Sequence, residues 1–217
     1  MKNLAPGLIS LLLFGASAVC RETVEVLPDK PGALVYWSEN RSDPRPLKIH
    51  YLKAALTAAP LEVFAMPGDD PDGPGPAESR LTMPLELFRK HGAVAAVNAN
   101  AFDGLPGDKA APYEWFEGRA VDIHGSVVSG GAVVSPLEKG RASFWLDAVQ
   151  KPHIGTPESL NSATEAVADW FSLLLTDGRI LPDAADRAVH PRTALGFDDT
   201  RTWLLFVVVD GRQPGFS

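Results

Sequence analysis

Apolar and polar residues alternate in two stretches near the start of the chain, over residues 47–51 and 61–65. A period of two is typical of strands with one buried face, so the pattern predicts two strands. We expect these two strands to pair as a hairpin, because only a short segment with Ala59-Pro60 separates them. The apolar positions that carry the pattern are Leu47, Ile49, Tyr51, Leu61, Val63 and Ala65.

Residues 67–97 predict a loop, a short helix and a strand, in that order. Residues 67–78 hold four prolines and three glycines, too many for a regular element, and predict a solvated loop. Residues 84–90 predict a short helix that begins with proline and stops at His91-Gly92, with an apolar face made by Leu85, Leu87 and Phe88. The apolar run 93–97 predicts a buried strand directly after it.

The second half of the chain is rich in short apolar runs. Valine-rich runs over 120–150, separated by glycine and serine, predict antiparallel hairpins. A helix is expected over 158–170, and a strand over 171–175 that ends at the turn Asp177-Gly178. Further strands are expected over 193–197 and 203–209, the latter buried on both faces. Strands outnumber helices, so we predict an α+β fold with a mixed, largely antiparallel sheet and a few flanking helices.

Two groups of polar residues stand at the ends of apolar strands. In the first, Asn98 and Asn100 lie on one side of an extended chain, and Asp103 follows after a turn. Short polar side chains at the end of a buried strand are often ligand groups. An Asx-turn that caps the strand explains the same pattern.

The second group combines both signs of charge. His190, Arg192 and Thr193 enter one predicted strand, while Asp210 and Arg212 leave the next. Two guanidinium groups near one sheet end suit an anionic substrate, because they match phosphate oxygens in a bidentate manner. A structural ion pair between Arg192 and Asp210 is the alternative.

Composition and charge narrow the classes of function. The 217 residues include 45% hydrophobic and 22% charged residues, which is typical of a globular protein. The formal net charge of −7 argues against nucleic acid as a partner. The one cysteine, Cys20, excludes an internal disulfide framework, a cysteine zinc site and a CxxC redox centre.

The first residues predict export. Lys2, a short apolar stretch over 8–14 and Ala16-Ser17-Ala18 are typical of a signal peptide over residues 1–18. A membrane span is the alternative, and lipid attachment at Cys20 is another. We expect a periplasmic, cell-envelope or extracellular protein. The oligomeric state has no signature in the sequence.

The residue spacings of several common catalytic and metal-binding motifs are absent from the sequence. The chain has no GxSxG elbow, no P-loop and no GxGxxG. The run at Asp69-Asp70 resembles an EF-hand, but Gly68 and Ser79 occupy its first and twelfth ligand positions. Asp122 and His124 would share a metal ion only if they were adjacent in space. The alternative is that they are an exposed pair of residues in a hairpin, with no metal. The sequence therefore predicts no metal site and no organic cofactor.

Two segments resemble a known family. AVNANAFDG (residues 96–104) and HPRTALGFDDTRTWLLFVVVDGRQPGFS (residues 190–217) are similar to signature segments of the phosphodiester glycosidase family. The resemblance extends over residues 47–217, which defines a predicted domain that follows the signal peptide and a lead-in segment at 19–46. It implies hydrolysis of a sugar-1-phosphodiester at the glycosidic carbon, which gives a free sugar and a phosphomonoester.

The resemblance also implies roles for individual residues. A carboxylate near the anomeric carbon and cations for the phosphate are required. Asp210, Asn98 and His190 are the expected catalytic residues, as the carboxylate, the group that orients the sugar or water, and the acid. The expected substrate-binding residues are Arg192, Thr193, Gly211, Arg212 and Asn100.

One departure from the family tempers this expectation. Family members continue with a strand that carries an Asn-Leu-Asp-Gly-Gly-Gly-Ser block, which these 217 residues do not contain. We therefore expect a domain that is incomplete at its C-terminus, with one side of the 203–209 strand unpaired. Two other functions fit the same residues: a non-catalytic envelope domain that binds anionic polysaccharide, and a metal-dependent phosphoesterase.

Overall fold

The computed structural model describes residues 21–27, 29, 31–43, 45–56, 61–108, 114–169, 173–181 and 190–211. The predicted signal peptide, Cys20 and Arg212 lie outside these residues. Within them the fold is largely β, with antiparallel sheets and a single short helix. The predicted antiparallel pairing is confirmed, whereas the expectation of several helices is wrong. Within the described ranges, no helix has the length and apolar character needed to cross a membrane.

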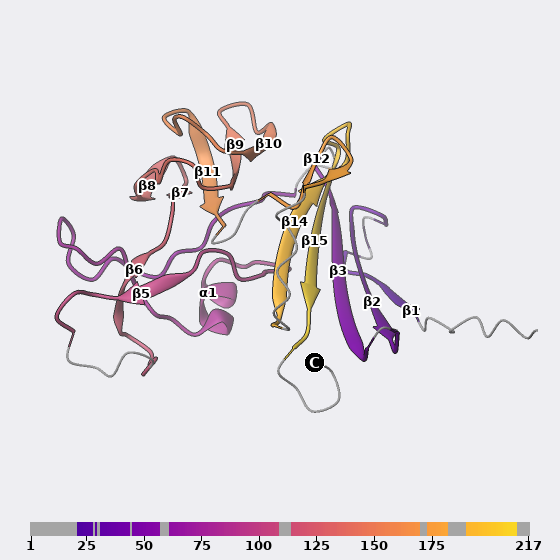
Figure 1. Ribbon diagram of the computed structural model, residues 1–217, viewed down its shortest axis with the longest axis horizontal. Coiled ribbons are helices and arrows are strands. Elements are labelled where there is room, and N and C mark those ends of the chain that lie inside the picture. Colours follow the sequence, from indigo (N-terminus) through magenta and orange to yellow (C-terminus); the bar gives the residue numbers. More distant parts are fainter. Residues whose placement is uncertain are drawn as a thin grey trace, which may run out of the picture.

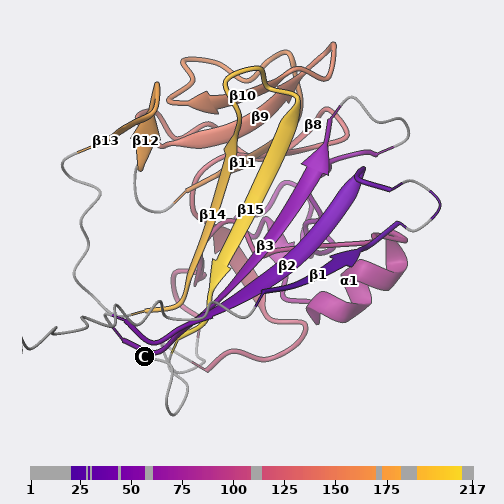
Figure 2. The same ribbon diagram turned by 90° about the vertical axis from the view of Figure 1, so that its right-hand side faces the viewer.

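A five-stranded antiparallel sheet forms one side of the molecule (Figure 1). Its strands fan out with the usual twist, and the second sheet lies across one end of them (Figure 2). In spatial order the strands are β1 (Arg21–Glu25), β2 (Leu34–Arg41), β3 (Leu47–Ala55), β15 (Trp203–Val209) and β14 (Arg192–Phe197). The segment predicted as a lead-in thus supplies β1 and β2, which are hydrogen-bonded to each other and, through β2, to β3.

The strand β15 has a partner on each side. It pairs with β14 through Phe197↔Leu204 and with β3 through Leu204↔Ala54. The expectation that this apolar strand has an unpaired side is therefore wrong, because β3 and β14 cover both of its edges.

A second five-stranded sheet, a three-stranded sheet and a hairpin complete the described fold. The second sheet has the order β10, β9, β11, β7, β8, the third has the order β4, β6, β5, and β12 and β13 form a hairpin. Their bounds are β10 (Pro152–Gly155), β9 (Ser143–Asp147), β11 (Ala163–Ala168), β7 (Val127–Ser129), β8 (Ala132–Ser135), β4 (Ser79–Arg80), β6 (Ala120–Ile123), β5 (Phe102–Gly104), β12 (Leu175–Thr176) and β13 (Arg179–Ile180). The strands and hairpins predicted over 120–150 are confirmed.

The main hydrophobic core lies between the first two sheets. Leu34, Ala54 and Leu204 of the first sheet pack with Phe144 and Leu146 of the second. Leu204 is fully buried. Burial of this apolar surface is what holds the two sheets together.

Several local predictions are confirmed. The helix α1 spans Pro84–Lys90 and ends at His91, as expected. Residues 67–78 contain no helix or strand. The turn Asp177-Gly178 joins β12 to β13, and its φ angles of 48° and 72° suit a two-residue hairpin turn. Of the strand predicted over 171–175, residues 171–172 lie outside the described residues, 173–174 form no strand, and Leu175 begins β12.

The helix expected over 158–170 is wrong. Its described part contains β11, which pairs with β9 and β7. Ala163, Ala166 and Ala168 of β11 are buried. Sheet pairing on both sides outweighs the weak helix preference of this alanine-rich segment.

Two predicted strands are not strands. Residues 61–65 do not pair with β3, so the predicted hairpin is wrong; β3 pairs with β2 and β15 instead. Side chains bond the backbone of Ala65, because its N–H donates to Glu165 and its carbonyl accepts from Ser129. Residues 93–97 also form no strand, and Val94 is 52% exposed, so this segment is not the buried strand we expected.

Candidate active site

The inner face of the five-stranded sheet, the face that packs on the second sheet, changes from apolar to polar along its length. Directly paired residues share a face, so the register defines three rows across the strands β2, β3, β15 and β14. The first row is Leu34, Ala54, Leu204 and Phe197, the second is Tyr36, Leu52, Phe206 and Leu195, and the third is Ser38, His50, Val208 and Thr193. Asp210 follows on the same face, since it lies two residues beyond Val208.

We call the first row the core end and the group His50, Thr193 and Asp210 the polar end. The rows are four residues apart, so about 13 Å separates the two ends. His50 and Thr193 lie two strands apart in one row, which is about 10 Å.

Asn98 and Thr193 connect the two groups of polar residues found in the sequence. The Thr193 hydroxyl donates to the side-chain oxygen of Asn98 over 2.7 Å. The two residues are 95 positions apart in the chain. The segment that leads to Asn98 therefore lies against the polar end of the inner face.

The carboxylate of Asp210 faces a histidine that sequence reasoning did not select. Its Oδ2 lies 3.4 Å from Nε2 of His50, and its backbone N–H donates to the carbonyl of Lys48 over 2.9 Å. The Asp210 side chain thus contacts His50, where the sequence suggested an ion pair with Arg192 as the alternative.

Gly211 holds the adjacent strand ends close together. A Cβ at this position would lie 2.6 Å from the Pro191 nitrogen and 3.1 Å from the His190 carbonyl carbon. His190 and Asp210-Gly211 are therefore neighbours, as their places at the ends of β14 and β15 predict. Any side chain at Gly211 would separate them.

A groove with a volume of about 1760 Å³ lies beside these elements. Asn98, Asn100, His190, Arg192 and Thr193 are among its lining residues. Arg192 and Thr193 are consecutive, so their side chains project from opposite faces of β14. Both line the groove, whereas His50 and Asp210 are not among its lining residues. Arg192 and Asn98 thus line one common concave surface.

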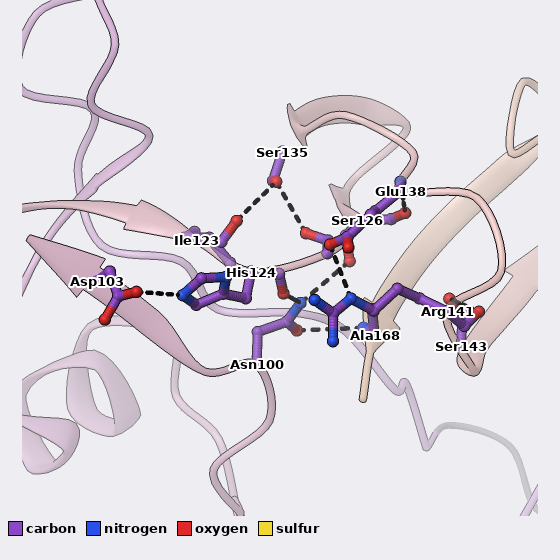
Figure 3. Close-up of polar contacts among 11 residues, drawn as sticks. Asn100, Asp103, Ile123, His124, Ser126, Ser135, Glu138, Arg141, Ser143 and Ala168 are labelled. Atoms are coloured by element: carbon purple, nitrogen blue, oxygen red, sulfur yellow. Dashed lines mark hydrogen bonds and ion pairs between the residues drawn. The ribbon is translucent and has the colours of Figure 1, made fainter. Parts of the chain in front are cut away.

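Asn100 joins two sheets through its amide group (Figure 3). Its nitrogen donates to the carbonyls of His124, at 2.9 Å, and Ser126, at 3.3 Å. Its oxygen accepts the backbone N–H of Ala168. The amide is therefore used in backbone bonding, and substrate binding by Asn100 stays a prediction.

Asp103 and His124 form an ion pair at the edge of this network (Figure 3). Their Oδ2 and Nε2 atoms lie 2.8 Å apart, and Asp103 is directly opposite Asp122 in the β5–β6 pair. The histidine thus contacts Asp103, where the sequence suggested Asp122. Among the described residues no group of three potential metal ligands occurs.

Two carboxylates near this network have altered pKa values. Burial raises the pKa of Glu78, although its Oε2 accepts the backbone N–H of Ile123. The Arg141 guanidinium lowers the pKa of Glu138 through a direct contact (Figure 3). The surroundings of Asn100 therefore hold charge of both signs.

Sequence reasoning missed His50 and its neighbour Tyr36. His50 occupies a polar position in the alternation of its strand, which suggests solvent. The partner Asp210 is 160 residues away, so only the sheet register brings them together. No local signal in the sequence indicates this contact.

Comparison with family models defines the class of protein. Residues 91–217, more than half of the chain, match the model described as Phosphodiester glycosidase. The chain belongs to this family of hydrolases. The match includes both signature segments, whereas β2 and β3 precede it. No match is found among curated proteins.

Proposed function

We propose that the protein hydrolyses a sugar-1-phosphodiester at its glycosidic bond. The oxygen of water bonds to the anomeric carbon while the bond from that carbon to the phosphate oxygen breaks. The electron pair stays on the phosphate oxygen, so the products are a free sugar and a phosphomonoester. The proposal rests on one observation: the bonded pair Asn98 and Thr193 lies at the same end of the same sheet face as Asp210, in a chain of this family.

The roles follow from the charge of each side chain and from the resemblance to the family. Asp210 stabilises the positive charge that develops at the anomeric carbon, or accepts the proton of the attacking water. Arg192, with Arg212, holds the departing phosphate. Asn98 orients the sugar hydroxyls or the water, and His190 serves as the acid.

The first test compares two aspartates in similar settings. Asp210 and Asp147 each contact a histidine, and their side chains are 23% and 25% exposed. Turnover is measured on a panel of methyl diesters of sugar 1-phosphates, with released reducing sugar as the readout. We expect Asp210→Asn to lower kcat by at least about 100-fold and Asp147→Asn to leave it near the wild-type value.

Other outcomes decide against the proposal. Equal turnover in Asp210→Asn and wild type removes Asp210 from the reaction. Saturable binding of an anionic polysaccharide without turnover of any diester supports the non-catalytic binding domain instead.

A further inference from the structure

His50 links two side chains of the inner face. Its Nδ1 lies 2.7 Å from the hydroxyl of Tyr36, and its Nε2 lies 3.4 Å from Oδ2 of Asp210. The rings of Tyr36 and His50 are also stacked, with centroids 6.0 Å apart. The three residues come from three adjacent strands or their ends, β2, β3 and β15.

The partners determine which ring nitrogen carries the proton. A carboxylate only accepts hydrogen bonds, so the contact with Asp210 requires a hydrogen on Nε2. In the neutral ring Nδ1 is then an acceptor, which the Tyr36 hydroxyl satisfies as donor. Tyr36 therefore favours the tautomer that donates to Asp210, in the way that a second partner commonly selects the tautomer of a histidine.

A second histidine–aspartate pair shows what is particular to His50. His153 and Asp147 lie 2.9 Å apart in the β9–β10 hairpin, and backbone N–H groups of Val149 and Lys151 also donate to Asp147. That carboxylate is fixed by its own turn. The carboxylate of Asp210, in contrast, is contacted across 160 residues by His50, from a strand that precedes the family match.

We propose that His50, held in one tautomer by Tyr36, is a positioning residue that orients the Asp210 carboxylate for the reaction. This inference rests on the proposed function. With Oδ2 in contact with His50, Oδ1 is the oxygen that we assign to the reaction. His50 acts as a neutral donor and transfers no proton in this role.

Substitutions at His50 separate positioning from proton transfer. Leucine removes the donor, whereas glutamine places an amide N–H near the position of the Nε2–H. In the full chain we expect His50→Leu to lower kcat about 10- to 100-fold with little change in KM. We expect His50→Gln to recover most of the activity and Tyr36→Phe to show an intermediate loss. His153→Leu is the matched control, because the His153 side chain is 26% exposed, the same as that of His50.

Two results would overturn the inference. Activity of His50→Leu within about twofold of wild type shows that the contact does not matter for the reaction. Activity of His50→Gln as low as that of His50→Leu shows that positioning by a neutral donor is insufficient.

A second measurement needs no substrate. Nitrogen-15 chemical shifts of the imidazole in wild type should show the tautomer with hydrogen on Nε2, and Asp210→Asn should change them. The opposite tautomer, or shifts that Asp210→Asn leaves unchanged, contradicts the inference. If wild type hydrolyses no sugar-1-phosphodiester, the proposed function fails, while these shifts still decide whether His50 holds Asp210.

Discussion

The two ends of the inner face use the same four strands for different purposes. At the core end, Leu34, Ala54 and Leu204 are buried against the second sheet. At the polar end, about 13 Å along the same strands, Thr193 bonds Asn98, and His50 contacts Asp210. Apolar burial at the core end stabilises the sheet, and the polar end carries the side chains that we assign to the proposed reaction.

This division explains how the polar residues are positioned although the hydrophobic core lies at the other end of the sheet. The strand β15 contains buried Leu204 near its start and ends at Val209, directly before Asp210, so packing of the strand orients the carboxylate that follows it. Functional groups placed on a rigid sheet are positioned more accurately than groups on loops. Perturbing each end separately tests this division.

The largest effect is expected at the core end. Leu204→Ala removes a fully buried side chain and should lower the free energy of unfolding by about 2–5 kcal/mol. Val208→Ala, at a half-buried position on the same face, should cost about 1 kcal/mol. Urea unfolding of both variants measures the difference, and equal losses would contradict the division.

A smaller effect is expected where the ends of β14 and β15 meet. In Gly211→Ala the new Cβ would collide with Pro191, and we expect a loss of about 1–3 kcal/mol in unfolding free energy together with reduced turnover. Gly196→Ala in β14 is the matched control, because its Cβ would meet no atom within 4 Å. If Gly211→Ala leaves both the unfolding free energy and the turnover unchanged, the two strand ends need not lie so close.

The contact between Asn98 and Thr193 should contribute less. A double-mutant cycle with Asn98→Ala and Thr193→Val should give a coupling free energy of about 0.5–1.5 kcal/mol, measured by urea unfolding. Strict additivity of the two substitutions would show that the hydrogen bond does not connect the two segments.

The smallest effect concerns the turn between β14 and β15, remote from the polar end. The Thr200 hydroxyl above all, with the backbone N–H of Trp203, lowers the pKa of Asp198 to about 2 from its usual 3.8. Because the folded-state pKa is depressed, its stabilisation is present above about pH 4 and is lost as pH falls toward 2. The stability advantage of wild type over Asp198→Asn should therefore shrink over this range. A pH-independent difference in urea unfolding would contradict the assignment.

The parts of the fold that depend on local pattern follow from the sequence. The bounds of α1 depend on Pro84 at its start and Gly92 after its end, and the bounds of β15 on a continuous apolar run. The segments 61–65 and 93–97 have similar local patterns but form no strands. Among the described residues, neither segment has a neighbouring strand to pair with. At Ala65, the side chains of Glu165 and Ser129 form hydrogen bonds with the backbone instead.

The site shows the same limit. Asn98, Thr193 and Asp210 can be selected from the sequence because each stands beside an apolar run, and the resemblance to the family marks the same segments. His50 cannot be selected in this way, since its importance depends on the register that places it in one row with Val208 and Thr193. Pairing between distant strands carries this information, and no short motif does.

The bond that breaks distinguishes a glycosidase from a phosphoesterase. Hydrolysis of a sugar-1-phosphodiester in water enriched in oxygen-18 should place the label in the free sugar, because water attacks the anomeric carbon. Mass spectrometry of both products measures it. Label in the phosphomonoester, with none in the sugar, would show attack at phosphorus and would contradict a glycosidase reaction at the polar end of this sheet.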